Sequence, residues 1–477
     1  MNGVGRTLWT FASIRGNLLV MSSCPSFVSY GNMLLSYPLA LREKRIWLVH
    51  DDSGCFIPMN FDGDILFGTN EDQTTDDLVL HSRSAAFEDL CRLYHLEVKR
   101  MPQKRFWSVL EACGERTNRD SRYPWEAILG KRVYREQVEL WAKDIQQQWR
   151  DNVSNDSVFG YWLGTYAKTL PDEKWNLKPF HVDVELYEAL RKENPTDSVL
   201  SSFEPEDYDT GECEVSTYSK SGSVTGRLVC LSGANPLRLK RVFRDKMLVS
   251  KWQKEGGKVV SLDYAALEPR VILWLNAIRQ GVKDRSPTTD LYQGIADTWL
   301  AGHGISREVI KTVILSLLYG ASIGTIKLKL GNDMQHEQVR DLVLLIQEKF
   351  CLQELKRQLI YEATNNDNGK TMIFNAFGRP IFLDDVEEDG GNISSFLVNY
   401  WTQSTAVDIA LLGFQKIFDR INSSEAVSEW IRPLGVLHDA LLLDIHPMAL
   451  HLIPKLVKLA SEPVPGSTFP VKVSTLS

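Results

Sequence analysis

The sequence lacks several features that define special classes of protein. No apolar run approaches the ~20 residues that a membrane-spanning helix needs, so no membrane partner is expected. The 31 glycines, 19 prolines and 43% hydrophobic residues are ordinary for 477 residues. These values exclude collagen, a coiled coil and wholesale disorder.

Cysteine is sparse and scattered. The seven cysteines are odd in number and include no Cys-x-x-Cys pair. This pattern disfavours a disulfide scaffold and a zinc ribbon, and it indicates a reducing compartment.

Positive charge is not in excess. The 54 Lys and Arg residues face 61 Asp and Glu residues, for a net charge of −7. A uniformly basic nucleic-acid coat is therefore excluded, whereas a local basic cleft is not. Carboxylates are absent before Glu43, and this opening stretch resembles an organelle transit peptide in composition. A buried strand region or a true start at Met21 are the alternatives.

The length predicts two to four subdomains. Short strands and turns are expected in residues 1–85, and helices from about residue 86. The stretch 193–212 contains Asn194-Pro195 and Glu204-Pro205-Glu206-Asp207, and it predicts a linker or an exposed loop.

Two aspartates stand at the ends of apolar, strand-like runs. Residues 258–263 predict a buried strand ending in Asp263, and the aliphatic residues around His438-Asp439 predict two strands joined by a tight turn. Buried carboxylates are costly unless a cation or donor compensates them, and two side by side repel. A pair of Mg²⁺ ions would stabilise them and support phosphoryl transfer. The alternative is that each aspartate caps a turn or pairs with an arginine.

A second pattern lies on the helix predicted over 306–319. Arg307, Lys311, Leu315 and Tyr319 follow one another at four-residue spacing and span about 18 Å on one slowly turning face. The cations stand at the helix start, where anions are favoured, and the aromatic ring stands at the far end. This order suits a nucleotide-binding shelf. An ordinary amphipathic helix with solvated cations is the alternative.

A third cluster is basic. Residues 238–246 contain Arg238, Lys240, Arg241, Arg244 and Lys246 against Asp245, a local net of four positive charges. Such a segment suits salt-sensitive binding to a phosphate backbone. A solvated charged face is the alternative.

The order of these clusters resembles the DNA polymerase I-like family (family A). The matching segments are Thr225-Gly226-Arg227-Leu228, residues 263–270, Arg307 with Lys311 and Tyr319-Gly320, Asn399 with Gln403 to Asp408, and His438-Asp439. They cover about 211–477 in the family's order and spacing. Tyr218 and the stretch up to Asn235-Pro236 look most like the compact bacteriophage polymerases. The resemblance implies a template-directed DNA polymerase that extends a primer with dNTPs.

The resemblance also implies roles for individual residues. Asp263 and Asp439, with the Tyr264 carbonyl, would hold two Mg²⁺ ions, for which Mn²⁺ could substitute. Lys311 would protonate the leaving pyrophosphate, and Glu268 would reject ribonucleotides at the sugar 2′ position. The residues assigned to the dNTP are Tyr264, Glu268, Arg307, Lys311, Leu315 and Tyr319. Those assigned to primer-template DNA are Arg227, Asn399, Gln403 and His438, together with the basic residues Arg238, Lys240 and Arg241.

Several positions depart from the family pattern. Ala440 stands in place of the usual Glu, Leu315 in place of Phe or Tyr, Ala266 in place of Gln, Tyr292 near the place of a phosphate-binding His, and Ser395 in place of Arg. Single-subunit RNA polymerases also lack the Glu and the aromatic ring, but they have a small residue where Glu268 stands. DNA synthesis is therefore favoured. A single-subunit RNA polymerase or primase-like enzyme and a catalytically degenerate primer-template-binding protein remain the alternatives.

The family's architecture is an α+β right hand with an antiparallel palm sheet and helical fingers and thumb. The expected division is a small N-terminal region (1–85), thumb (86–210), first palm part (211–283), fingers (284–394) and second palm part (395–477). Residues 1–85 are too few for a proofreading exonuclease domain, so no 3′–5′ exonuclease activity is expected. A monomer is expected, with a separate exonuclease, helicase or processivity factor as candidate partners. The expected location is the cytoplasm, that of the host cell if a phage encodes the chain, with organelle targeting as the alternative.

Overall fold

The computed structural model describes residues 46–50, 55–59, 78–81, 91, 96, 129–151, 175–220, 222–280, 290–301, 304–331, 334–364, 371–377, 379–383 and 393–476. The carboxylate-free opening stretch lies outside the described residues, as does most of the region 1–128.

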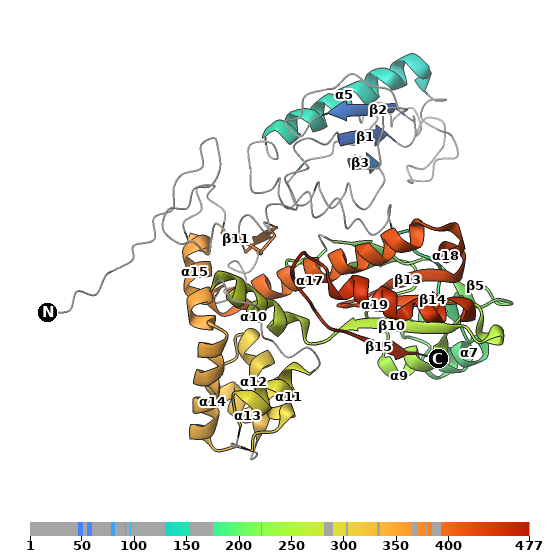
Figure 1. The fold of residues 1–477 in the computed structure, drawn as a ribbon. Helices are drawn as coiled ribbons and strands as arrows, with labels where there is room; N and C mark the ends of the chain where they lie inside the picture. Colours follow the sequence, from blue (N-terminus) through green and yellow to red (C-terminus); the bar gives the residue numbers. More distant parts are fainter. Residues whose placement is uncertain are drawn as a thin grey trace.

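A four-stranded antiparallel sheet forms the centre of the described chain, with the strand order β13-β14-β10-β15 (Figure 1). Its strands are β10 (Lys258–Tyr264), β13 (Ile431–Leu437), β14 (Ala440–Ile445) and β15 (Val471–Thr475). The two strands predicted around His438-Asp439 are confirmed as the hairpin β13–β14, and the predicted strand ending in Asp263 is β10. Residues such as Leu262, Leu441 and Leu443 are fully buried, which is why both runs are apolar.

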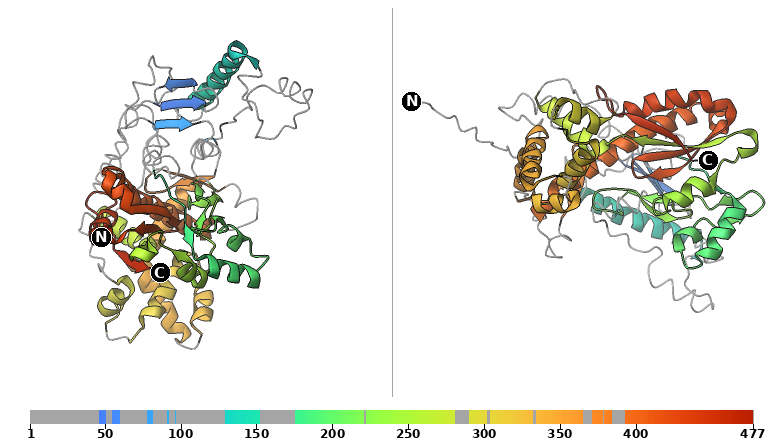
Figure 2. Two further views of the ribbon diagram at one scale, coloured as in Figure 1. Left: turned by 90° about the vertical axis from the view of Figure 1, so that its right-hand side faces the viewer. Right: turned by 90° about the horizontal axis from the view of Figure 1, so that it is seen from below.

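Three helices pack around this sheet. The long helix α17 (Ile393–Asn422) contacts α10 (Leu267–Arg279) and α19 (Ile453–Ser461), and α19 also contacts β15. Figure 2 (right) shows α17 alongside the sheet. The short helix α18 (Glu425–Trp430) and the 3₁₀ helix η5 (Pro447–Leu452) complete this part. Apolar residues of the sheet and of all three long helices share one continuous core.

A group of helices extends from the sheet on the side of α10. It consists of α11 (Leu291–Thr298), α12 (Arg307–Leu318), α13 (Ile323–Leu330), α14 (His336–Lys349) and α15 (Leu352–Thr364), with the hairpin β11 (Met372–Phe374) and β12 (Pro380–Phe382) (Figure 1). The predicted helix start at Ser306 is confirmed, since its hydroxyl accepts a hydrogen bond from the Val309 amide. The core of this group is continuous with that of the sheet, so the two parts share one packed interior.

A smaller four-stranded antiparallel sheet includes part of the stretch 193–212. Its order is β5-β6-β4-β9, formed by Pro205–Asp207, Glu212–Cys213, His181–Val182 and Leu248–Val249. The helices α7 (Val184–Glu193), α8 (Ser198–Ser201) and α9 (Arg241–Met247), the ribbon β7–β8 (Thr217–Ser219, Val229–Ser232) and the turn η4 (Gln253–Glu255) lie in the same stretch of chain. Residues 193–212 do not form a linker, because Leu200 and Phe203 are buried in a core shared with Val259 and Leu442 of the central sheet. The exposed loop expected there corresponds to residues 206–210, the longest exposed run of the stretch.

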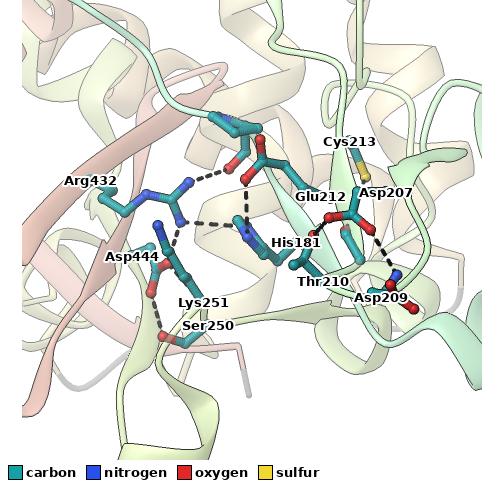
Figure 3. A network of polar contacts seen from close by, with 12 residues as sticks. His181, Asp207, Asp209, Thr210, Glu212, Cys213, Ser250, Lys251, Arg432 and Asp444 are labelled. Carbon is teal, nitrogen blue, oxygen red and sulfur yellow. Dashed lines mark hydrogen bonds and ion pairs between the residues drawn. The ribbon is translucent and has the colours of Figure 1, made fainter.

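A buried ionic network ties this small sheet to the central one (Figure 3). The Arg432 guanidinium bonds Asp444 Oδ2 at 3.0 Å and the Pro179 carbonyl at 3.2 Å. Ser250 Oγ donates to Asp444 Oδ1 at 2.5 Å, and the Lys251 amide donates to Oδ2 at 3.0 Å. Asp444 is 1% exposed, so an unpaired charge here would be costly.

His181 gives this network a pH dependence. Burial, and then the nearby charges of Arg432 and Lys251, lower the pKa of His181 to about 4 from 6.5. The folded state therefore resists protonating this ring, so its contribution to stability is present above pH 6.5 and is lost as the pH falls towards 4. Between pH 7 and pH 5 the free energy of unfolding of the wild type should fall by about 2 kcal/mol more than that of H181Q. Urea unfolding of both proteins at the two pH values measures this difference. Equal losses would show that His181 does not titrate as stated.

The described N-terminal elements form a separate small sheet. β1 (Ile46–His50) pairs antiparallel with β2 (Cys55–Met59) and parallel with β3 (Leu78–His81). Helix α5 (Lys131–Trp149) buries Val138, Ile145 and Trp149. It lies near these strands in Figure 1 and in the left view of Figure 2. No helix of the described residues has the length and apolar character needed to cross a membrane.

Candidate active site

The two central strands bring Asp263 and Asp439 to the same end of the sheet. Asp263, on β10, is the register partner of Ala440 at the start of β14, and Asp439 directly precedes Ala440 in the turn. The Tyr264 amide donates to the Asp439 carbonyl oxygen at 3.2 Å. Two aspartates from distant parts of the sequence therefore lie at neighbouring backbone positions, close enough for the charge of Asp439 to act on Asp263.

The two carboxylates are electrostatically strained. Burial, and then the charge of Asp439, raise the pKa of Asp263 to about 6, although Lys472, Arg244 and Arg241 oppose this shift. Burial also raises the pKa of Asp439, against its own amide, His438 and Arg227. The Asp263 side chain is exposed to solvent on one side, and the surrounding protein still removes part of its hydration. The surrounding cations do not fully offset burial and repulsion, so both pKa values stay raised, as expected of a site completed by a bound cation.

Two carboxylates and one main-chain carbonyl fit a divalent cation that takes its remaining ligands from water and substrate. The described residues contain no group of three or more His, Cys, Asp or Glu side chains able to hold a metal ion. Two carboxylates with a nearby main-chain carbonyl match the way Mg²⁺ is held by one or two carboxylates, with waters and substrate phosphates. The Tyr264 side chain does not contribute, because its hydroxyl donates to the Ala460 carbonyl at 2.5 Å inside the core. Tyr264 therefore borders the carboxylates with its main chain and not with its side chain.

Two strained backbone positions flank the pair. Ala266 has φ = 54° and His438 has φ = 56°, in the left-handed region that residues other than glycine rarely adopt. Ala266 is the N-cap of α10, and His438 begins the turn that carries Asp439. Such strain persists only where the surroundings enforce it, and it concentrates at functional sites.

Glu268 links three elements beside the carboxylates. Its Oε1 bonds Arg227 Nη2 at 3.0 Å, and its Oε2 accepts from the Tyr319 hydroxyl at 3.3 Å. The pKa of Glu268 is raised, mainly by burial and further by the charge of Asp439. The charge of Arg227 only partly opposes this rise. A pocket of about 50 Å³ opens here, and its lining residues are Arg227, Leu267, Glu268, Gln403, Ala406, Val407, His438 and Asp439. Residues from four sequence segments therefore meet at one small opening.

The predicted shelf lies on the more exposed side of α12. Arg307, Lys311 and Leu315 are half-buried and Tyr319 is exposed, whereas Ile310, Val313, Ile314 and Leu317 form the buried face. Arg307 is not free, because its Nε bonds Asp290 Oδ2 at 2.7 Å and its Nη1 pairs with Glu308. Its guanidinium also lies over the Tyr292 ring, with 5.6 Å to the centroid.

The residues assigned to DNA lie in two regions: Arg227, Asn399, Gln403 and His438 at or next to the pocket, and the basic residues near α9. Asn399 and Gln403 lie one turn apart on α17, with Gln403 Nε2 donating to Asn399 Oδ1 at 2.7 Å, while the Ser395 side chain lies outside the description. Arg238, Lys240 and Arg241 are exposed at and before the start of α9. Arg244 and Arg241 lie near enough to Asp263 for their charges to lower the pKa of its carboxyl.

Sequence reasoning missed Arg379. This side chain is 1% exposed, and it donates to the carbonyls of Lys220 at 2.9 Å and Thr225 at 3.4 Å. Gly226 has φ = 75°, and a Cβ there would lie 1.0 Å from Arg379 Nη1. Arg379 therefore holds the loop that carries Arg227. An arginine within the apolar stretch 372–383 was the one signal that could have revealed it.

Comparison with known proteins supports the fold. No protein-family model matches the sequence, and no curated protein matches it. Among the 137 solved chains that match is the POL domain of Pol1 from M. smegmatis, in complex with DNA primer-template and dNTP. The TM-score is 0.54 at 14% identity, over 93% of this chain and 97% of that chain. The predicted α+β right-hand polymerase fold, with its antiparallel sheet, is confirmed.

Proposed function

We propose that this chain is a template-directed DNA polymerase that extends a primer 3′-OH with dNTPs and releases pyrophosphate. The observation that carries the proposal is the meeting of Asp263 and Asp439 at one end of β10 and β14, next to Glu268 and α12. The polymerase fold and the order of the sequence motifs support it. The proposed partners are primer-template DNA and dNTPs, and the proposed state is a monomer.

Asp263 and Asp439, with the Tyr264 carbonyl, would hold two Mg²⁺ ions. When bound, these ions would neutralise charge on the attacking and leaving oxygens of an in-line transfer. Arg307 and Lys311 would bind the triphosphate, with Lys311 also positioned to donate a proton to the leaving pyrophosphate. Catalysis would then rest on positioning and charge neutralisation, without a covalent intermediate.

The primer-template would lie against the pocket side of the sheet. Arg227, Gln403 and His438 line or border the pocket that contains Asp439, and Asn399 supports Gln403. The exposed cations Arg238, Lys240 and Arg241 would bind phosphates of the duplex. Glu268 is held from both sides by Arg227 and Tyr319, so it would present a fixed obstacle to a ribose 2′-OH.

Our proposal for the domains keeps the fingers at 284–394 and the palm segments at 211–283 and 395–477. It moves the start of the palm upstream to about residue 175. The predicted thumb, residues 86–210, includes the stretch 175–210, whose residues Phe180 and Phe203 pack in one core with Val259 and Leu434 of the central sheet.

One observation favours a second candidate, a single-subunit RNA polymerase. Ala440 pairs with Asp263 and is 4% exposed, so the carboxylate usual in the DNA enzymes is replaced by a small buried side chain. Leu315 likewise replaces an aromatic ring. Glu268 opposes this candidate because it occupies the position where the RNA enzymes have a small residue.

Primer extension with single dNTPs and single rNTPs tests the proposal. We expect templated addition of dNTPs that requires Mg²⁺ or Mn²⁺ and stops with a chelator. The preference for dNTP over the matching rNTP should be about 100-fold or more, because Glu268 leaves the 2′-OH without room. E268A should narrow this preference while dNTP addition persists. A preference for rNTPs would favour the RNA polymerase, and tight primer-template binding without extension would favour a degenerate binding protein.

A further inference from the structure

The Arg307 guanidinium contacts two carboxylates, and its single positive charge cannot neutralise both. Its Nε donates to Asp290 Oδ2 at 2.7 Å, and its Nη1 pairs with Glu308 on the next residue of α12. The Arg307 and Asp290 side chains are 31% and 35% exposed, whereas Glu308 is 71% exposed. Solvent therefore screens the Glu308 contact more than the Asp290 contact. Arg307, Asp290 and Glu308 together carry a net charge of −1.

Asp290 divides its two oxygens between two tasks. Oδ1 accepts hydrogen bonds from the Tyr292 and Gln293 amides, both at 3.1 Å, and so caps the N-terminus of α11. Oδ2 binds Arg307. Partial burial alone would raise the pKa of Asp290, but the Gln293 amide and the Arg307 guanidinium outweigh it and hold the pKa below the usual range. Asp290 is therefore ionised at neutral pH.

The other cation of the shelf differs in this respect. Lys311 lies one turn further along α12, and within the described residues it forms no ion pair. A triphosphate that approached the shelf would meet an available ammonium group at Lys311 and an occupied guanidinium at Arg307. Capping α11 needs only Oδ1, so the bond to Arg307 is not required by the local backbone.

We propose that Asp290 is a displaceable counter-anion for Arg307 and thereby sets the affinity of the site for the incoming nucleoside triphosphate. Asp290 binds the guanidinium edge that a triphosphate oxygen would use, so phosphate and carboxylate compete for one donor. The Arg307 guanidinium also lies over the Tyr292 ring, a contact that does not involve Asp290. This inference rests on the proposed polymerase function, and in it Asp290 acts only by competing with the triphosphate for the Arg307 guanidinium.

D290N separates the two tasks. The amide oxygen of asparagine can still accept from both α11 amides, whereas its NH₂ group cannot accept from Arg307 Nε. We expect D290N to bind dNTP about 3- to 10-fold more tightly than wild type. The KM for dNTP should fall by the same factor with kcat unchanged. Equilibrium binding of dNTP to the full chain on a dideoxy-terminated primer-template measures affinity without chemistry.

Two further variants test the inference independently of folding. D290S retains a good N-cap and removes the carboxylate, and it should reproduce the tighter binding. D297N removes one negative charge from the same helix, where Asp297 accepts from Gln293 at 2.8 Å, and it should leave dNTP affinity at the wild-type value. Thermal unfolding of each variant shows whether the α11 cap is intact.

The outcomes distinguish this inference from the proposed function. If wild type extends primers but D290N and D290S bind dNTP no more tightly, the counter-anion role is wrong and the polymerase stands. Weaker binding by both variants would show that Asp290 holds Arg307 for the triphosphate and does not compete with it, and would also overturn the inference. If wild type neither extends primers nor binds dNTP, both proposals fail.

Discussion

Replacing Asp263 or Asp439 by asparagine should lower the rate of primer extension by about 1,000-fold or more. Each substitution preserves shape and removes one of the two charges proposed to hold the metal ions, on which charge neutralisation in the transition state would depend. Primer-template affinity should be retained or raised, because a negative charge leaves the DNA-binding face. Single-turnover extension and equilibrium DNA binding measure the two quantities separately.

The same variants should be more stable than wild type. The pKa of Asp263 is raised to about 6, so the folded state disfavours the ionised carboxyl and stability falls as the pH rises through this range. Asparagine removes that penalty, and the midpoint of thermal unfolding at pH 7 should rise. D297N is the matched control, with unchanged extension. Retained extension by D263N would contradict the proposed function, and unfolding at a lower temperature would contradict the electrostatic description of the site.

The largest loss of stability is expected from D444N, at about 3–5 kcal/mol. Asparagine leaves the Arg432 guanidinium, whose side chain is 8% exposed, without its carboxylate partner. The Ser250 hydroxyl and the Lys251 amide also lose a charged acceptor. Urea unfolding at pH 7 gives the change in the free energy of unfolding.

A double variant shows whether the buried unpaired charge is the cause. R432M/D444L removes both charges, so it should recover part of the loss, although Ser250 and Lys251 still cost about 1–3 kcal/mol when unsatisfied. E136Q breaks the exposed Arg132–Glu136 pair, at 3.7 Å, and should change stability by less than about 0.5 kcal/mol. A D444N protein as stable as E136Q would show that the network does not join the two sheets.

The structure also supplies what the sequence patterns could not. The stretch 193–212 contains two Pro dipeptides and many carboxylates, and these local signals favour a loop. It forms α8, β5 and the first residue of β6, because Leu200 and Phe203 pack in a core shared with Val259 and Leu442 of the central sheet. Arg379 was missed for a similar reason: its acceptors are the carbonyls of Lys220 and Thr225, far away in the chain.

The sequence by itself determined the local features of this protein. Three of these features are strand β10, which carries Asp263 one residue before its end, the hairpin around His438-Asp439 and the helix capped by Ser306. They follow from apolar periodicity and capping, which act over a few residues. Only the tertiary structure decided that Asp263 lies beside Asp439, that Asp290 binds Arg307, and that the charges of Arg241 and Arg244 act on Asp263. Those contacts depend on strand register and on packing between distant segments, and no local pattern encodes them.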